Sequence, residues 1–168
     1  MNLLLVTGSR ALARTPAAEW WATQRILAAL SRLDLGAELV TGDAIGPDEW
    51  ARKAAIAAGL PALVFNLYGR VIDGREGWRW TEQQRPSFGS PEGKRWPLVR
   101  NDAMVRYAAE RAADGARVQV LALTAAWAPT RGTQFTASAA RKAGLTVEAC
   151  EAPGELGPDG WMEVRDAG

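Results

Sequence analysis

Residues 1–10 have the sequence MNLLLVTGSR, in which an apolar run, Leu3–Thr7, leads directly into glycine, serine and arginine. A short apolar run that ends in a polar turn is typical of a strand whose sheet is covered on both faces. The same pattern predicts four further strands, at Glu38–Thr41, Ala62–Phe65, Val118–Thr124 and Leu145–Glu148. These five runs therefore predict a sheet that lies between two layers of other structure.

Helical patterns separate these runs, and prolines and glycines mark their ends. The predicted helices span residues 16–33, 46–59, 97–113 and 133–143. On the first helix, one predicted face consists of Trp20, Thr23, Leu27 and Leu30. Because strands alternate with helices along the chain, we expect parallel strands joined by right-handed crossovers. The predicted fold class is α/β, a three-layer α/β/α sandwich with a mainly parallel sheet.

The composition of the 168 residues limits the chemistry. The sequence has no histidine and one cysteine, Cys150, which excludes a histidine-dependent triad, a histidine-ligated metal and an internal disulfide. We expect no metal and no cofactor, and a Cys150 that lies past the last strand and is inert. Most of the eight tryptophans, including Trp20, Trp21 and Trp50, are expected to pack against the core.

The charge balance and the hydropathy of the sequence indicate which partners and which location to expect. The 20 basic and 19 acidic residues leave a net charge of +1, which gives no strong attraction to nucleic acid or to a membrane surface. No apolar stretch is long enough to span a membrane, and no secretion signal is evident. We therefore expect a cytoplasmic protein with no membrane partner.

Two segments stand apart from the predicted domain, which covers residues 1–150. Residues 66–96 form a basic insert rich in glycine, tryptophan and arginine, and a loop of this length is usually functional. Residues 151–168 form an acidic tail that either adds an edge strand or lies loose.

Four polar segments fall at what is predicted to be one edge of the sheet. Ligands of parallel α/β sheets bind at the carboxyl ends of the strands. Because unrelated turns need not share an edge, this coincidence favours a common binding site. The candidate ligand contacts are Gly8, Ser9, Arg10, Gly42, Asp43, Ala44, Asp48, Arg100, Asn101, Trp127, Arg131, Gly132, Thr133, Gln134 and Thr136.

The segment around Gly132 has the clearest chemistry for an anion. Glycine at a helix start lets the backbone approach a ligand, and the free N–H groups and the helix dipole favour a phosphate. Arg131, Thr133 and Thr136 would add donors. The alternative is that Thr133 is only the cap of the helix and Gly132 only a tight turn.

The other segments also allow two interpretations. Residues 7–10 either contact a ligand or only turn the chain, and they match neither a Walker loop nor a dinucleotide fingerprint. Asp43 and Asp48 either bond sugar hydroxyls or, in the case of Asp48, cap a helix. Arg100 either pairs with a phosphate or is solvated, and Trp127 either stacks on a base or packs.

Together the four segments resemble the SLOG superfamily, which includes YspA-like proteins, the LOG cytokinin-activating phosphoribohydrolases and the DprA-type Rossmann domains. The matching residues are Thr7-Gly8-Ser9-Arg10, Gly42-Asp-Ala-x-Gly-x-Asp48, Arg100-Asn-x-x-Met104 and Gly132-Thr-x-x-Thr136. The chain looks most like the YspA-like branch, over about residues 1–148. The resemblance implies a Rossmann-like fold that binds nucleotides or nucleotide-derived signals. It places the phosphate over Gly132 and Thr133 and the first two loops beside the sugar and base.

The resemblance to the LOG enzymes is incomplete where it concerns their reaction. In those enzymes, an arginine in Arg-Lys-x-x-Met and a glutamate in Gly-Gly-x-Gly-Thr-x-x-Glu support cleavage of an N-glycosidic bond. Arg100 matches the first motif, with Asn101 in place of lysine, but Thr136 occupies the glutamate position. Because threonine supplies no carboxylate, LOG-type hydrolysis requires another acid, such as Asp43 or Asp48.

Three functions follow, in order of preference. The first is binding of a nucleotide or nucleotide-derived small molecule, in a sensing, carrying or sequestering role. The second is a nucleotide N-glycosidase or phosphoribohydrolase, in which Arg100 holds phosphate or ribose and Asp43 or Asp48 is the acid–base group. The third, single-stranded nucleic acid binding through the insert, is disfavoured by the net charge. Related folds often pair, which makes a homodimer a further expectation.

Overall fold

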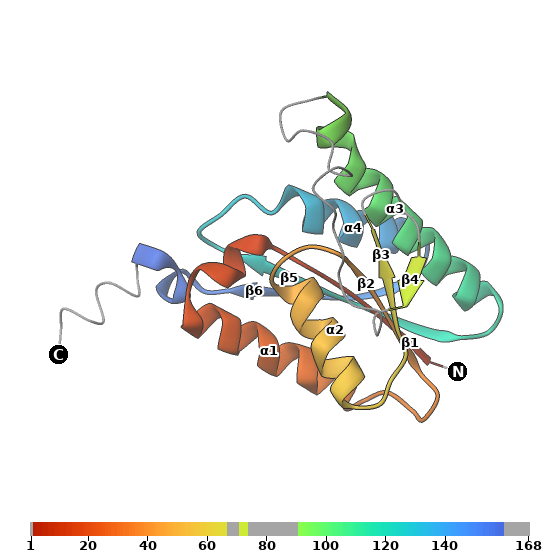
Figure 1. The fold of residues 1–168 in the computed structure, drawn as a ribbon. Helices are drawn as coiled ribbons and strands as arrows, with labels where there is room; N and C mark the ends of the chain where they lie inside the picture. Colours follow the sequence, from red (N-terminus) through yellow and green to blue (C-terminus); the bar gives the residue numbers. More distant parts are fainter. Residues whose placement is uncertain (1, 67–70, 74–90, 160–168) are drawn as a thin grey trace.

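The structure is a computed structural model that describes residues 2–66, 71–73 and 91–159. The described residues form a six-stranded sheet of order β4-β3-β2-β1-β5-β6 (Figure 1). The strands are β1 (Asn2–Gly8), β2 (Glu38–Gly42), β3 (Ala62–Phe65), β4 (Val71–Asp73), β5 (Arg117–Ala125) and β6 (Thr146–Ala152). All neighbours pair in parallel except β4, which runs antiparallel to β3 at one edge. The predicted α/β class with a mainly parallel sheet is confirmed, and β4 is a strand that the sequence did not predict.

Helices cover both faces of the sheet, as Figure 1 shows. The helices α1 (Pro16–Leu30) and α2 (Pro47–Ala57) pack on one face, and α3 (Pro91–Ala113) and α4 (Arg131–Lys142) pack on the other. The described residues also form two short 3-10 helices, η1 (Arg10–Arg14) and η3 (Gly154–Leu156). The result is the three-layer sandwich that the sequence predicted.

Alternation along β1 explains why its sequence is apolar throughout. Leu4 and Val6 point into the core beneath α1 and α2, whereas Leu3 and Leu5 point into the core beneath α3 and α4. All four side chains are completely buried. The strand therefore needs apolar residues at successive positions rather than at every second one.

The predicted apolar face of the first helix is wrong at Trp20 and Leu27, whereas Leu30 is buried as predicted. Trp20 is 66% exposed and Leu27 is 44% exposed. The buried face of α1 is instead formed mainly by small residues such as Ala18 and Ala22, together with Ile26. Small side chains let the helix axis approach the sheet, which leaves the large Trp20 no room on that side. Trp21 and Trp50, by contrast, do pack against the core as predicted.

Several predicted boundaries also differ. The strand β6 extends to Ala152, so Cys150 lies within the last strand and not past it. Burial and the neighbouring Glu148 raise the pKa of the Cys150 thiol, which favours its protonated form. The helix α3 begins at Pro91, inside the predicted insert, and Pro97 lies within it.

Parts of both distinctive segments lie outside the described residues. These parts are residues 67–70 and 74–90 of the basic insert and residues 160–168 of the acidic tail. The described part of the tail ends β6, forms η3 and is held by Thr15, whose hydroxyl donates to the Leu156 carbonyl at 2.6 Å. Within the described ranges, no helix has the length and apolar character that crossing a membrane requires.

The strand order fixes where a ligand would bind. The chain moves outward from β1 through β2 to β3, and then returns to place β5 on the other side of β1. The connections after β1 and β5 therefore leave the sheet in opposite directions, which opens a crevice at their carboxyl ends in folds of this type. The loops after β1, β2 and β5 all lie at this edge.

Candidate functional site

The ends of β1 and β2 are closed over by side chains of the protein itself. A Cβ on Gly8 would overlap Pro47, the first residue of α2. A Cβ on Gly42 would lie 2.5 Å from Asp48 Oδ2 and 3.0 Å from the Arg100 guanidinium. Internal packing therefore explains both glycines, and neither of them requires a ligand.

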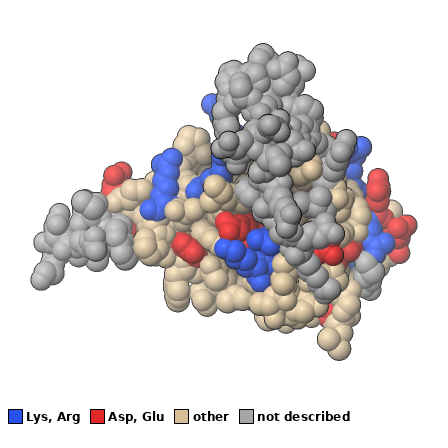
Figure 2. All heavy atoms as spheres, viewed as in Figure 1, with Lys and Arg blue, Asp and Glu red and all other residues tan. Residues whose placement is uncertain are grey.

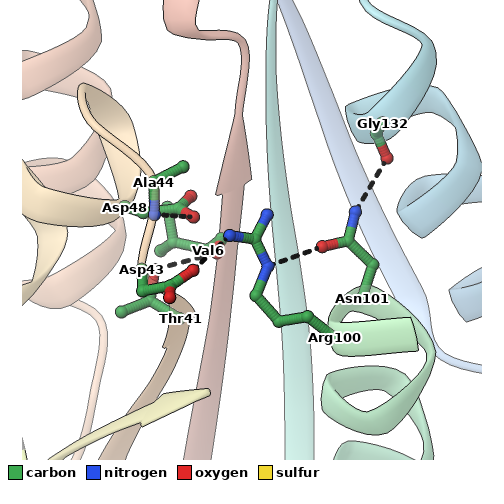
Figure 3. Close-up of polar contacts among 8 residues, drawn as sticks. All are labelled: Val6, Thr41, Asp43, Ala44, Asp48, Arg100, Asn101 and Gly132. Carbon is green, nitrogen blue, oxygen red and sulfur yellow. Dashed lines mark hydrogen bonds and ion pairs between the residues drawn. The ribbon is translucent and has the colours of Figure 1, made fainter. Parts of the chain in front are cut away.

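A buried ion pair joins α3 to the loop after β2 (Figure 3). Arg100 Nη1 donates to Asp43 Oδ1 at 2.5 Å, and the two side chains are 10% and 2% exposed. Two charges buried in this way are stable only when each is paired and hydrogen-bonded. Arg100 is therefore not the solvated surface residue of the alternative interpretation.

Asp48 is a second carboxyl beside the same guanidinium. The residue is 3% exposed, Oδ2 accepts from the Ala44 backbone N–H at 3.3 Å, and Oδ1 has no hydrogen-bond partner among the described residues. Burial raises its pKa from 3.8 to about 6, although Arg100 and the backbone N–H groups of Ala44 and Gly8 oppose the rise and Asp43 adds to it.

The helix-cap interpretation of Asp48 does not match its position. The N-cap of α2 is Gly46, which has φ of +96°, and Asp48 is the second residue of the helix. Its carboxylate bonds backward to Ala44, in the loop, rather than to the N–H groups of the first turn. Glycine at position 46 provides the left-handed conformation that turns this loop into the helix.

Asn101 connects α3 to α4. Its Oδ1 accepts from Arg100 Nε at 3.1 Å, and its Nδ2 donates to the Gly132 carbonyl at 3.2 Å. Thr136 Oγ1 donates to the same carbonyl at 3.0 Å, so its hydroxyl bonds back along its own helix. Figure 3 shows the resulting row, with Asp43 and Asp48 on one side of Arg100 and Asn101 and Gly132 on the other.

The start of α4 differs from the predicted one. The N-cap is Thr130, and its side chain makes no capping hydrogen bond. The prediction that Thr133 caps the helix is therefore wrong, because the helix begins two residues earlier. Gly132 lies inside the first turn, and among the described residues a Cβ there would meet only Asn101 Nδ2, at an ordinary contact distance of 3.9 Å. Thr133 is buried beside it.

The remaining predicted contacts differ in burial. Ser9 is buried, and its Oγ accepts from the Ala11 N–H to cap η1. Arg10, Arg131 and Gln134 are exposed, and Ala44 is half-buried.

Trp127 packs against the C-terminal segment. A Cβ on Gly157 would lie 2.7 Å from the indole ring, so backbone covers part of that ring. The buried Nε1 has no hydrogen-bond partner in the described ranges. That Trp127 stacks on a base stays a prediction. Such stacking would require the part of the indole ring that Gly157 leaves uncovered.

Pro47 is a residue that the sequence did not indicate for this edge. The sequence places Pro47 at the start of the helix predicted over residues 46–59, and the structure shows that its ring also packs over Gly8. The pattern of a glycine after β1 and a proline after β2 becomes meaningful only once the two strands are known to be neighbours.

The visible surface of the described residues has no region dominated by one sign of charge. In Figure 2, basic and acidic side chains are interspersed on the visible face rather than separated by sign.

No group of three or more metal-ligating side chains occurs among residues 2–66, 71–73 and 91–159. Comparisons with family models, curated proteins and solved structures gave no match.

Proposed function

We propose that this chain binds a nucleotide or a nucleotide-derived small molecule, with an anionic group at the start of α4 beside Arg100. Gly132 carries this proposal. A glycine inside a helix costs about 0.5–1 kcal/mol relative to alanine. No side chain or backbone of the described residues fills the space above Gly132 closely enough to require it. A ligand that approaches the backbone at residue 132 would explain why this position is glycine.

The start of α4 and the Arg100 side chain both provide hydrogen-bond donors at this edge of the sheet. The first N–H groups of a helix have no partner within the helix, and the side chain of Thr130 does not cap those of α4. Arg100 uses Nε and Nη1 in hydrogen bonds within the protein (Figure 3), and Nη2 carries two further N–H donors. A set of donors next to a helix dipole favours an acceptor-rich anion such as a phosphate.

The loops after β1 and β2 offer the surface for the rest of the ligand. The backbone at Gly46 lies close to Ser9 and Arg10, so the two loops are neighbours. Ile45, in the second loop, is 56% exposed and provides apolar surface beside the polar groups. A nucleoside needs such a combination, because its base is largely apolar on its faces and its sugar is polar.

Calorimetric titration with AMP, ribose 5-phosphate and adenosine tests the proposal. We expect both phosphate-bearing compounds to bind more tightly than adenosine by at least about tenfold, since charge-assisted contacts to phosphate contribute roughly 1.5–3 kcal/mol each. Chromatography of each mixture should return the ligand intact. If adenosine binds as well as AMP, or if neither phosphate compound binds, the proposed anion site is wrong.

The second candidate, a nucleotide N-glycosidase, is favoured by Asp48. An acid–base group works best when its pKa is near the working pH, and burial brings the pKa of Asp48 to about 6. Asp43, by contrast, is held in the ion pair with Arg100. Release of free adenine from AMP by the wild type, and its loss in Asp48→Asn, would establish this activity in place of simple binding.

A further inference from the structure

Asn101 contacts both parts of the proposed anion site. One end of its amide accepts from Arg100 Nε, and the other donates to the Gly132 carbonyl in the first turn of α4. The residue is 3% exposed. Both ends of the amide are therefore engaged within the protein, which argues against the direct ligand contact that the sequence suggested.

The contact with Arg100 fixes the orientation of the guanidinium. One hydrogen bond, from Nη1 to Asp43, would hold a single corner of this planar group. A second bond, from Nε to Asn101, holds another corner and so fixes the plane. The direction in which Nη2 points is thereby set before any ligand arrives.

The contact with Gly132 fixes the other part of the site. Thr136 also donates to the Gly132 carbonyl, but Thr136 belongs to α4 and its bond does not reach another element. The Asn101 bond comes from α3, and it therefore sets where the first turn of α4 lies relative to Arg100.

We propose that Asn101 is a positioning residue that holds the Arg100 guanidinium and the first turn of α4 in a fixed relation, so that both bind one anionic group of the ligand. This inference rests on the proposed function. Two sets of donors converge on one anion only if their separation is fixed, and a displacement of about 1 Å can cost about 100-fold in a preorganised site.

The test measures AMP and inorganic phosphate binding by calorimetry. Asn101→Leu keeps the approximate size and Asn101→Ala keeps the helix, so at least one variant should fold. Each removes both bonds, and we expect about 10- to 100-fold weaker binding of both probes. Asp102→Asn is the control, because Asp102 is exposed and pairs only with Arg106 on the same helix among the described residues.

Thr136→Val separates positioning from simple support of α4. This variant removes the other side-chain bond to the same carbonyl and leaves the contact between Asn101 and Arg100 in place. If Asn101 acts through Arg100, Thr136→Val weakens AMP binding much less than Asn101→Ala does. An equal loss in the two variants would overturn the inference.

The other outcomes are also decisive. If the wild type binds neither AMP nor phosphate, the proposed function and this inference both fail. If the wild type binds AMP and the folded Asn101 variants bind it equally well, the proposed function survives and the positioning role of Asn101 is wrong.

Discussion

Two glycine-bearing regions at the same edge of the sheet differ in what lies above the glycine. After β1 and β2, Pro47 covers Gly8, and Asp48 and Arg100 cover Gly42. At the start of α4, a Cβ on Gly132 would meet only one described atom, at van der Waals distance. Side chains thus explain the glycines of the first region, whereas no described residue requires the glycine of the second. A glycine motif alone does not distinguish these two situations.

The largest expected effect tests whether the strand ends depend on their own ion pair. Arg100→Met leaves Asp43 and Asp48 buried without their cation, and we expect a loss of about 3–5 kcal/mol in the free energy of unfolding. Arg131→Met, on the exposed side of α4, should change it by less than about 0.5 kcal/mol. Urea denaturation of the two variants measures both. If both variants lose less than about 0.5 kcal/mol in the free energy of unfolding, the strand ends do not depend on the Arg100 ion pair.

The next effect is a pH dependence in the same covered region. The pKa of Asp48 is raised to about 6, so the folded protein keeps a proton that the unfolded chain releases near pH 3.8. Stability is therefore highest below about pH 4 as far as this group is concerned, and it falls as the pH rises to about 6, by about 3 kcal/mol.

Asp48→Asn should remove this dependence. Asparagine can still accept from the Ala44 N–H, and it does not ionise. Unfolding measured from pH 4 to pH 8 should give a flatter profile for Asp48→Asn than for the wild type, while Asp102→Asn keeps the wild-type profile. If Asp48→Asn and the wild type give parallel profiles, another group is responsible.

A smaller effect concerns packing at Gly8. Gly8→Ala forces a methyl group against Pro47, and overpacking of this kind costs about 1–3 kcal/mol. The matched control is Gly154→Ala, because a Cβ at Gly154 meets no described atom within 4 Å. Combining Gly8→Ala with Pro47→Gly should recover part of the loss, measured as a coupling energy. Strictly additive losses would show that Pro47 is not the cause.

The smallest effect on stability is expected at Gly132. Gly132→Ala should leave the free energy of unfolding unchanged or raise it by up to about 1 kcal/mol, because alanine is the better helix former. It should still weaken AMP binding by about tenfold. Ser138→Ala, on the exposed part of α4, controls for helix propensity alone. If Gly132→Ala binds AMP as tightly as the wild type does, Gly132 has no role in the site.

The sequence predicted the fold well because the fold depends on patterns within single elements. Apolar runs and their bounding glycines and prolines located the five parallel strands and the four helices to within a few residues for most ends. Most of the buried face of α1 was missed because its buried side consists largely of small alanines while the large Trp20 is exposed, which gives a misleading periodicity. Burial there follows from room beside the sheet, and Ala18 fits where Trp20 does not.

The candidate site was predicted in part. That Gly42, Asp48, Arg100 and Gly132 would share one edge follows from parallel topology. The partners of these residues do not follow from it, because they depend on the tertiary packing of α2, α3 and α4. The bond from Asn101 to the Gly132 carbonyl is an example, since its acceptor is a backbone atom and leaves no trace in residue identity.

The contacts of the C-terminal segment have a consequence for shortened forms of the chain. Leu156 accepts the Thr15 hydroxyl, and Gly157 lies on the indole of Trp127. Removing the chain from residue 153 onward would remove this cover and expose part of the Trp127 indole to water. A chain trimmed at that point would expose new apolar surface at the β5–α4 loop, and we expect it to self-associate more readily than the longer chain.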